Sequence, residues 1–405
     1  MGDQLPPGEM HAIRRTMALE HCKWDAQVGD VAVLGDRPLV LSRSAWREIS
    51  TLAEALDREL LLAEAEIARR PGLLGHLGLP GPIARVLRQG AADRPSVRVT
   101  RYDFHRTNDG WRVSEANTDV PGGYVEASAF TNLFAHRFGL EPTGDPAAAL
   151  VEAIGSRLGS EGPVALVHAT GYSDDAQVMH LLAGAFREAG IDAALCGPQS
   201  QPDATAAVLR FFPAEWLPAL ERRSGWQRYF RGDAPPMTNP GLAIICQSKR
   251  WPMLWDRLET DLPTWRSLCP ATHDVPAAGL AIDANVVYKP ALGRVGEGVI
   301  MHALVGPEAG DREARRSRRS FARDRWRRWL GLTPRWIGQD RFHPLEAETS
   351  PEHRGPVCLG VYVIDGRASG VYGRVGSGSI VDHRATDVAV LLEAAPDHEE
   401  PTPWQ

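Results

Sequence analysis

Apolar residues in the first third of the chain recur at helical spacing and then change to strict alternation. Between residues 45 and 69 an apolar side chain returns every three or four positions, and Pro71-Gly72 follows. This pattern predicts an amphipathic helix. Segments 97–104 and 111–117 alternate instead, and a strong turn sequence, Thr107-Asn108-Asp109-Gly110, joins them. We therefore expect a β-hairpin after the helix.

The middle of the chain has the order strand, helix, strand. An apolar run at 164–167 precedes a helical stretch that ends at Gly190, and a short strand follows at 191–195. This order predicts a parallel βαβ unit, which the apolar run 206–212 extends. A proline-rich stretch then marks a boundary before residue 241.

Further strands are expected in the last third of the chain. They lie at 286–288, 336–340, 357–364 and 369–372. The fold class is therefore α/β, in units that we place at 1–145 (a helical region with the hairpin at 95–125), 146–240 (the βαβ unit), 241–394, and a disordered tail at 395–405.

Composition excludes several classes of protein. The chain has 405 residues and a formal net charge of -6, so it has no overall attraction to nucleic acid or to anionic membranes. Its five scattered cysteines form no CxxC pair, and neither a signal-peptide core nor a membrane-spanning run is present. We expect a cytoplasmic protein whose partners are small molecules. The 39 glycines and 31 prolines exceed average usage and are expected partly in functional loops.

The hairpin carries the first candidate chemistry. Alternation places Arg101 and Asp103 on one face of the first strand, and Trp111, Val113, Glu115 and Asn117 together on one face of the second. With a loop at 108–110, Asp103 lies opposite Glu115 and Arg101 opposite Asn117. Opposed carboxylates repel unless Arg101 or a cation compensates them, and two carboxylates with an amide oxygen suit Mg²⁺. Solvated charges on an edge hairpin explain the spacing equally well.

Cations recur near glycines farther along the chain. Lys289-Pro290 opens a loop with Gly293, Arg294, Gly296 and Gly298, which has the composition to close over phosphates but is not a Walker A motif. Lys249 and Arg374 stand in similar ambiguous settings. Each cation taken singly also fits an ordinary surface position.

Together, and in this order, the segments from about residue 95 to about residue 385 resemble the glutathionylspermidine synthase family, a branch of the ATP-grasp enzymes. The resemblance covers the synthetase part only. It implies a permuted ATP-grasp fold with a preATP-grasp-like βαβ domain at 146–240 and a nucleotide-binding domain at 241–394. It also implies roles for individual residues: Asp103, Glu115 and Asn117 would hold two Mg²⁺ ions; Lys249, Lys289, Gly293, Arg294 and Gly296 would contact ATP phosphates; Gln339 and Asp340 would lie at the adenine edge; Arg101 and Arg374 would face the transferred phosphoryl group and the activated carboxylate.

The implied reaction is an ADP-forming ligation. A substrate carboxylate attacks the γ-phosphorus of ATP to give an acyl phosphate, and an amine then displaces phosphate to form an amide. Where the family has NADTPT and GREG, this chain has Asn117-Thr-Asp119-Val-Pro121-Gly-Gly and Gly293-Arg-Val295-Gly-Glu. We therefore expect an amino acid, a peptide or a natural product as the substrate, not glutathione and spermidine.

Two other functions fit the same residues. One is a small-molecule kinase that stops at phosphoryl transfer, and the other is a non-catalytic nucleotide-binding scaffold, which the presence of Asp103, Glu115, Lys289 and Arg374 argues against. The arginine-rich run 312–328 has the pattern of a solvated amphipathic helix, which could instead dock an acidic substrate or carrier protein, or bind RNA nonspecifically. No membrane or specific nucleic-acid partner is expected.

Overall fold

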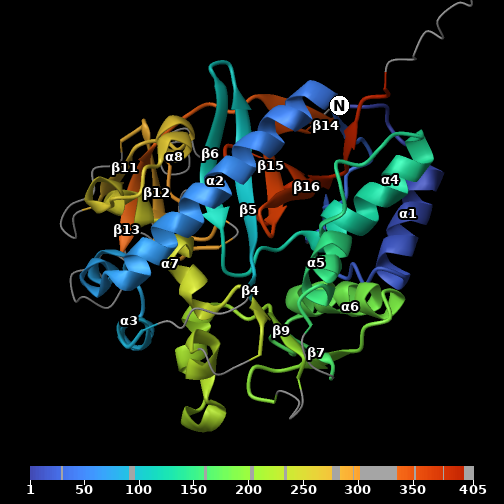
Figure 1. Cartoon of the computed structure of the whole chain (residues 1–405). Helices are drawn as coiled ribbons and strands as arrows, with labels where there is room; N and C mark the ends of the chain where they lie inside the picture. The colour runs from blue at the N-terminus through green and yellow to red at the C-terminus, as the bar shows by residue number, and fades with distance from the viewer. Residues whose placement is uncertain are drawn as a thin grey trace, which may run out of the picture.

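The computed structural model of the chain covers most of its length. The described residues are 1–28, 31–90, 96–158, 162–200, 205–231, 235–275, 283–294, 296–301, 335–350, 353–376 and 378–395. Figure 1 shows the arrangement of their helices and strands.

An antiparallel sheet joins the hairpin to strands from the end of the chain. Its strand order is β17-β16-β15-β5-β6, and β14 pairs with β15 outside this path. The bounds are Val99–Thr107 for β5, Gly110–Asn117 for β6, Glu346–Ser350 for β14, His353–Ile364 for β15, Arg367–Val375 for β16 and Thr386–Val388 for β17. The hairpin is therefore not an isolated ribbon, because β15 pairs along β5.

Helix α2, Arg43–Arg69, crosses one face of this sheet (Figure 1). It begins at Ser42, whose hydroxyl accepts a hydrogen bond from the Ala45 amide at 3.1 Å, a normal N-cap. Its apolar stripe lies in one core cluster with side chains of β5 and β15, including Phe104 and Val361. Apolar packing therefore joins α2 to this face of the sheet.

A second sheet is fully parallel. Its order is β4-β10-β9-β7-β8, and α6, Ser173–Glu188, connects β7 to β8 as the βαβ pattern predicts. The strand bounds are Ser96–Val97 for β4, Val164–Val167 for β7, Ala193–Cys196 for β8, Ala207–Arg210 for β9 and Met237–Thr238 for β10. Helix α5, Pro146–Gly155, packs on α6.

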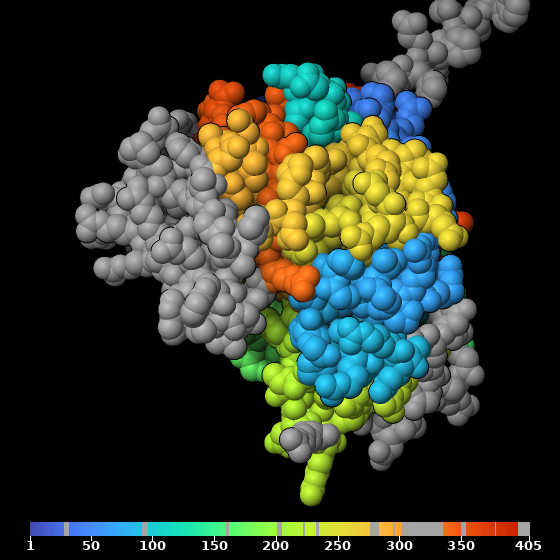
Figure 2. Space-filling view, turned by 90° about the vertical axis from the view of Figure 1, so that its left-hand side faces the viewer, coloured from blue at the N-terminus to red at the C-terminus, as the bar shows by residue number. Residues whose placement is uncertain are grey.

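A third, antiparallel sheet has the order β11-β13-β12, with bounds Thr272–Asp274, Trp336–Asp340 and Val286–Pro290 respectively. Short helices lead into it, namely α7 Ile244–Gln247, the 3-10 helix η7 Trp251–Arg257 and α8 Pro263–Leu268. Figure 2 shows this yellow segment beside the blue segment of α2, where α2 contacts α7 and α8. The rings of Trp251 and Trp265 meet edge to face at 4.8 Å.

Segments from the first and last parts of the described chain pair with each other. Strand β3, Leu39–Leu41, pairs in parallel with β18, Val390–Leu392. The remaining helices are α1 Pro7–Leu19, η1 Pro71–His76, α3 Gly81–Arg88, a π-helix η2 Glu126–Phe130, α4 Thr131–Phe138, η3 Ala214–Ala219, η4 Arg222–Ser224, η5 Trp226–Phe230 and η6 Gly241–Ala243. A short ribbon pairs β1 Gln27–Val28 with β2 Val31–Ala32.

The predicted elements are confirmed with shifts at their ends. Most of the short elements were not predicted, and neither were the longer helices α1, α3, α4 and α5. The arginine-rich run 312–328 lies outside the described residues, as do Val295 and residues 396–405 of the expected tail. The division into units at residues 145, 240 and 394 stays a prediction. In the part of the chain that the structure describes, no helix is both long and apolar enough to cross a bilayer.

Candidate active site

The hairpin has the predicted pairing at its inner end but not the predicted alternation. Asp103 lies opposite Glu115, and Arg101 opposite Asn117. Between Asp103 and Phe104 the register shifts by one residue, because Ser114 forms a bulge in β6. Trp111 and Val113 therefore lie with Phe104 in the core, whereas Glu115 and Asn117 share the opposite face with Asp103. The expectation that all four residues of β6 share a face is wrong.

Two arginines converge on Asp103. Arg101 donates to both of its carboxylate oxygens, from Nε at 2.7 Å and from Nη2 at 3.0 Å. Arg374 on β16 donates to Oδ2 at 3.2 Å. All three side chains are buried. The repulsion expected between Asp103 and Glu115 is therefore compensated on the Asp103 side by two guanidinium groups.

Glu115 is compensated by lysines from outside the hairpin. The Nζ of Lys249 lies 2.9 Å from its Oε2 and also donates to the Gly293 carbonyl at 2.7 Å. Lys289 on β12 donates to the Ser114 carbonyl at 3.2 Å and to Gln339 at 2.8 Å. Burial alone would raise the pKa of Glu115, but Lys249 and Lys289 outweigh it and hold the pKa at about 2. Burial lowers the pKa of Lys289.

This depressed pKa makes Glu115 a source of acid sensitivity. Because the folded-state pKa lies below the unfolded value of about 4.3, its contribution to stability is complete above pH 4.3 and is lost as pH falls toward 2. Compared with Glu115→Gln, the wild type should lose up to about 1.4 kcal/mol of unfolding free energy for each pH unit in that window. Urea unfolding of both proteins between pH 5 and pH 3 measures this difference, and a constant difference would contradict the assignment.

Gly360 makes room for Arg101. It lies opposite Asp103 on β15, and a Cβ atom there would stand 2.6 Å from Cδ and 2.9 Å from Nε of Arg101. Only a residue without a side chain lets the arginine lie flat across the strand. The sequence did not predict a role for Gly360, because a single glycine within a strand has no side chain that indicates one.

Gly360→Ala is expected to displace Arg101 from Asp103 and to destabilise the protein by about 1–3 kcal/mol, the usual cost of overpacking. Urea unfolding, together with any turnover the wild type shows, measures both effects. Gly184→Ala in α6 is the matched control, since its Cβ would meet nothing within 4 Å. That control should leave stability equal or slightly higher, and equal behaviour of the two variants would contradict the steric argument.

Arg294 points away from the lysines. It donates to Glu215 at 2.7 Å and to Asp119 at 3.0 Å, and so ties the glycine-rich loop to the end of β6 and to η3. Asp119 also accepts from Arg210 at 2.5 Å and from the Ala214 amide at 2.8 Å. Burial alone would raise the pKa of Asp119, but Arg210 and Arg294 outweigh it and lower the pKa. Asp119, Arg210 and Glu215 were not predicted as site residues.

The two residues expected at the adenine edge point in different directions. Gln339 is buried and accepts from Lys289, whereas the side chain of Asp340 is 55% exposed and lies 2.9 Å from His273. Gly293 contacts Lys249 through its carbonyl, and Gly296, with φ of 71°, lies beside Asp382. The two lysines, Gln339 and the Gly293 carbonyl are thus brought together beside Glu115, whereas Asp340, Arg294 and Gly296 have other partners.

The donor set on the hairpin fits a magnesium ion. Asp103, Glu115 and Asn117 offer hard oxygen atoms on one face, and the low pKa of Glu115 keeps that carboxylate ionised. The arginines donate one hydrogen bond to Oδ1 of Asp103 and two to Oδ2, so Oδ1 retains a second lone pair for a cation. No cluster of three or more His, Cys, Asp or Glu side chains suited to a metal occurs among the described residues.

Comparison with known proteins identifies the family of this chain. The family model described as glutathionylspermidine synthase preATP-grasp matches residues 22–393. The chain belongs to this family.

A solved structure shares the fold of this family member. It is a glutathione synthetase-like effector, GSS30, from Globodera pallida in its apo form, with a TM-score of 0.61 and 12% sequence identity. The match covers 96% of this chain and 98% of that chain. No curated protein sequence matches. The mixed α/β structure thus resembles a glutathione synthetase-like ATP-grasp protein.

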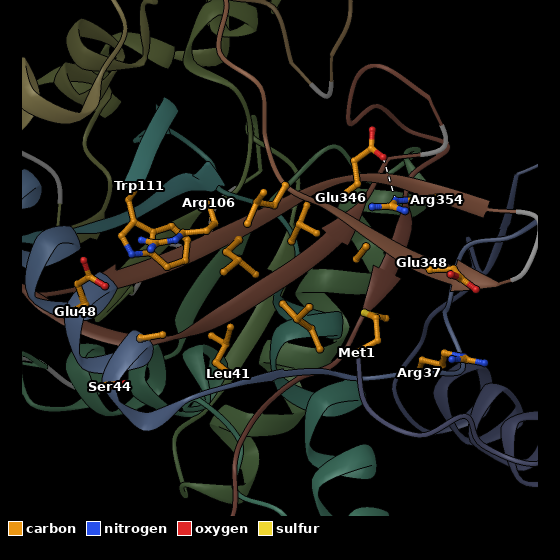
Figure 3. Close-up of a pocket in the computed structure, with 16 residues that line it drawn as sticks. Met1, Arg37, Leu41, Ser44, Glu48, Arg106, Trp111, Glu346, Glu348 and Arg354 are labelled. Atoms are coloured by element: carbon orange, nitrogen blue, oxygen red, sulfur yellow. Dashed lines mark ion pairs between the residues drawn. The ribbon is translucent and has the colours of Figure 1, made fainter. Parts of the chain in front are cut away.

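A groove of about 880 Å³ in this glutathionylspermidine synthase family member lies on the other face of the sheet (Figure 3). Arg106, Trp111 and Leu359 line it, together with the N-terminal end of α2 and residues of β14. Trp111 lies with Phe104 on the face opposite Asp103. Of the residues predicted from the sequence as site residues, none lines this groove, so the charged cluster and the groove are separate features.

Proposed function

We propose that this protein is an ATP- and Mg²⁺-dependent carbon–nitrogen ligase that joins a carboxylate to an amine through an acyl phosphate. One observation carries the proposal. Two buried arginines and two lysines surround the facing carboxylates of Asp103 and Glu115 on one face of the antiparallel sheet. Phosphoryl transfer depends on positioning and charge neutralisation more than on covalent catalysis, and this cluster supplies both.

In this proposal ATP lies between the antiparallel sheet and the three-stranded sheet. Lys249 and Lys289 would bind its phosphates, with Gly293 and Gly296 closing over them. Gln339 and Asp340 would lie at the adenine edge on β13. This arrangement corresponds to a permuted ATP-grasp fold, with residues 241–394 as the nucleotide-binding domain. Support comes from the convergence of Lys249, Lys289 and Gln339 beside Glu115.

The catalytic groups would come from the central sheet. Asp103, Glu115 and Asn117 would hold Mg²⁺, two ions in our proposal, which neutralises charge on the triphosphate. Arg101 and Arg374 would orient the substrate carboxylate and the γ-phosphoryl group in line. The carboxylate oxygen forms a bond to the γ-phosphorus as the bond to ADP breaks. The amine nitrogen then attacks the acyl carbon, phosphate leaves with the bonding electrons, and the nitrogen loses a proton.

The proposed substrates are an amino acid, a peptide or a natural product bearing a carboxylate, together with an amine. Departures from the family sequence support this choice, because Thr118, Val120 and Gly122 stand where the family has other residues beside the acceptor loop, and Val295 replaces an acid beside the phosphate loop. Arg294 would contact phosphates only after leaving Asp119 and Glu215.

A mass-spectrometric assay tests the proposal. Purified protein is incubated with ATP and Mg²⁺ and a panel of carboxylates and amines, and ADP, phosphate and products are measured. An amide whose formation depends on both substrates is the expected result. A phosphorylated product with no amide would favour a kinase, and absence of nucleotide binding would contradict both enzymes.

A further inference from the structure

Tyr372 lies directly beside the two arginines of the candidate site. It is on β16, two residues before Arg374, and pairs with Gly360. The Cζ atom of Arg101 is 5.4 Å from the centre of its ring, and that of Arg374 is 5.1 Å away. These distances are typical of cation–π contacts. One aromatic ring therefore contacts both guanidinium groups that converge on Asp103.

The ring itself is fixed by its surroundings. Its hydroxyl donates to Asp387 at 2.7 Å. Gly123, with φ of 98°, brings its backbone so close that a Cβ atom would lie 2.4 Å from Cδ1 of the ring. Burial, followed by the charge of Asp387, raises the pKa of Tyr372 well above its usual range, so the phenol keeps its proton. The hydrogen bond to Asp387 and the close backbone of Gly123 therefore set the position of the ring.

Asp387 belongs in turn to a buried group of charges from three distant segments. Lys23 is 3% exposed and forms ion pairs with Asp25 at 2.8 Å, with Glu126 in the π-helix, and with Asp387 at 3.7 Å. Burial alone would lower the pKa of Lys23, but Glu126, Asp387 and Asp25 outweigh it and keep the lysine charged. Breaking a buried ion pair is costly, so this group holds Asp387 firmly in place.

The charge balance around Asp103 explains why a ring is needed. One carboxylate faces two cations, Arg101 and Arg374, and the Nε of Arg374 is buried with no hydrogen-bond partner among the described residues. The electron-rich face of an aromatic ring is a second partner for a guanidinium group. It holds the two cations together without adding a negative charge that would repel a phosphoryl group.

We propose that Tyr372 is a positioning residue for Arg101 and Arg374, and that the Lys23–Asp387 pair, supplied from the N-terminal segment and β17, anchors it. The expected effect on kcat rests on the proposed ligase function. The placement of Arg101 and Arg374 by the ring does not depend on turnover. The role is distinct from catalysis, since Tyr372 acts through the arginines.

Kinetic variants test the proposal first. Tyr372→Leu removes the ring and should lower kcat on the order of 10²-fold while leaving the KM for ATP nearly unchanged, as expected when reacting groups are misplaced. Tyr372→Phe retains the ring and should recover kcat to within several-fold of the wild type. Tyr372→Phe and Asp387→Ala remove the same hydrogen bond, and Asp387→Ala also removes the pair with Lys23, so the double variant should lose no more kcat than Asp387→Ala alone. Additive losses would contradict the anchor.

A readout without turnover separates this inference from the proposed function. The NMR signals of the Nε–H groups of Arg101 and Arg374 are assigned by their loss in Arg101→Lys and Arg374→Lys. In the wild type, the ring of Tyr372 should shift both signals. Tyr372→Leu should abolish these shifts, and Tyr372→Phe should keep them. The control is Arg137→Ala, which breaks the exposed pair with Glu9 between α1 and α4 and should change nothing.

The outcomes are distinguishable. If the wild type forms no ADP with any substrate pair, the proposed function fails, and the arginine spectrum still decides the positioning. If Tyr372→Leu leaves both arginine signals unchanged, the positioning inference is wrong whatever the turnover. Should Tyr372→Leu fail to fold, the cycle of Tyr372→Phe and Asp387→Ala still tests the anchor, because both variants remove the hydrogen bond of the Tyr372 hydroxyl. Tyr372→Phe should also keep both arginine signals shifted, and loss of these shifts would contradict the inference.

Discussion

Asp103→Asn is expected to reduce ATP turnover by about 10³-fold while the protein still folds. The carboxylate accepts three hydrogen bonds from Arg101 and Arg374 and is a proposed magnesium ligand. The asparagine amide keeps the shape of the carboxylate but removes the negative charge that pairs with both arginines. Its NH2 group is a donor and would face the N–H donors of the guanidinium groups. Loss of one preorganised electrostatic group commonly costs 10² to about 10³-fold in rate.

The measurement is ADP release, with circular dichroism and thermal unfolding to verify the fold. Asp109→Asn is the control, because it makes the same chemical change in the same hairpin at an exposed turn position. It should retain wild-type turnover. Wild-type turnover in Asp103→Asn would show that neither the metal nor the arginines depend on this carboxylate.

The largest expected effect on stability is at Asp119. Asp119→Ala should lower the free energy of unfolding by about 3–5 kcal/mol, because it leaves the Arg210 guanidinium buried without its counter-charge. Both side chains of this pair are 0% exposed. The same substitution also removes the acceptor of the Ala214 amide and one partner of Arg294.

Urea unfolding at pH 7 measures the loss. Asp256→Ala serves as the control, since it breaks an ion pair with Arg266 whose aspartate is 90% exposed, and it should have little effect. The double variant Asp119→Leu with Arg210→Met should recover much of the stability, because it removes the buried charge together with its partner. If Asp119→Ala is as stable as Asp256→Ala, the buried pair of Asp119 and Arg210 does not contribute the expected stability.

The hairpin shows both what the sequence could predict and why it could not predict more. The expected loop at 108–110 gives the correct pairs at Asp103 and Arg101, but for an incorrect reason. Thr107 already pairs with Gly110, which alone would move the register by one residue, and the bulge at Ser114 restores it. Alternation identifies strands well, whereas a bulge depends on packing that a local pattern does not contain.

Charged residues whose ion-pair partners lie far away in the sequence were not predicted, for a similar reason. Lys23 and Asp387 lie at opposite ends of the sequence, and Asp119 meets Arg210 only because the end of β6 lies beside the end of β9. Arg101 and Asp103 were singled out by strand alternation in the hairpin, and Lys289 and Arg374 by neighbouring glycines, whereas the family resemblance supplied only their expected roles. Residues that hold such groups in place carry no comparable motif.

The strand order of the antiparallel sheet also determines when the site can exist during synthesis. Strand β5 lies between β6, which follows it directly, and β15, which begins at His353. A nascent chain that has emerged to residue 350 therefore carries the carboxylates of Asp103 and Glu115, both lysines and Arg101, but not Gly360, Tyr372 or Arg374. Pairing over such sequence distance is slow compared with local contacts. The charge balance around Asp103 therefore cannot be complete until the last strands of the sheet, β15 and β16, have been synthesised and paired.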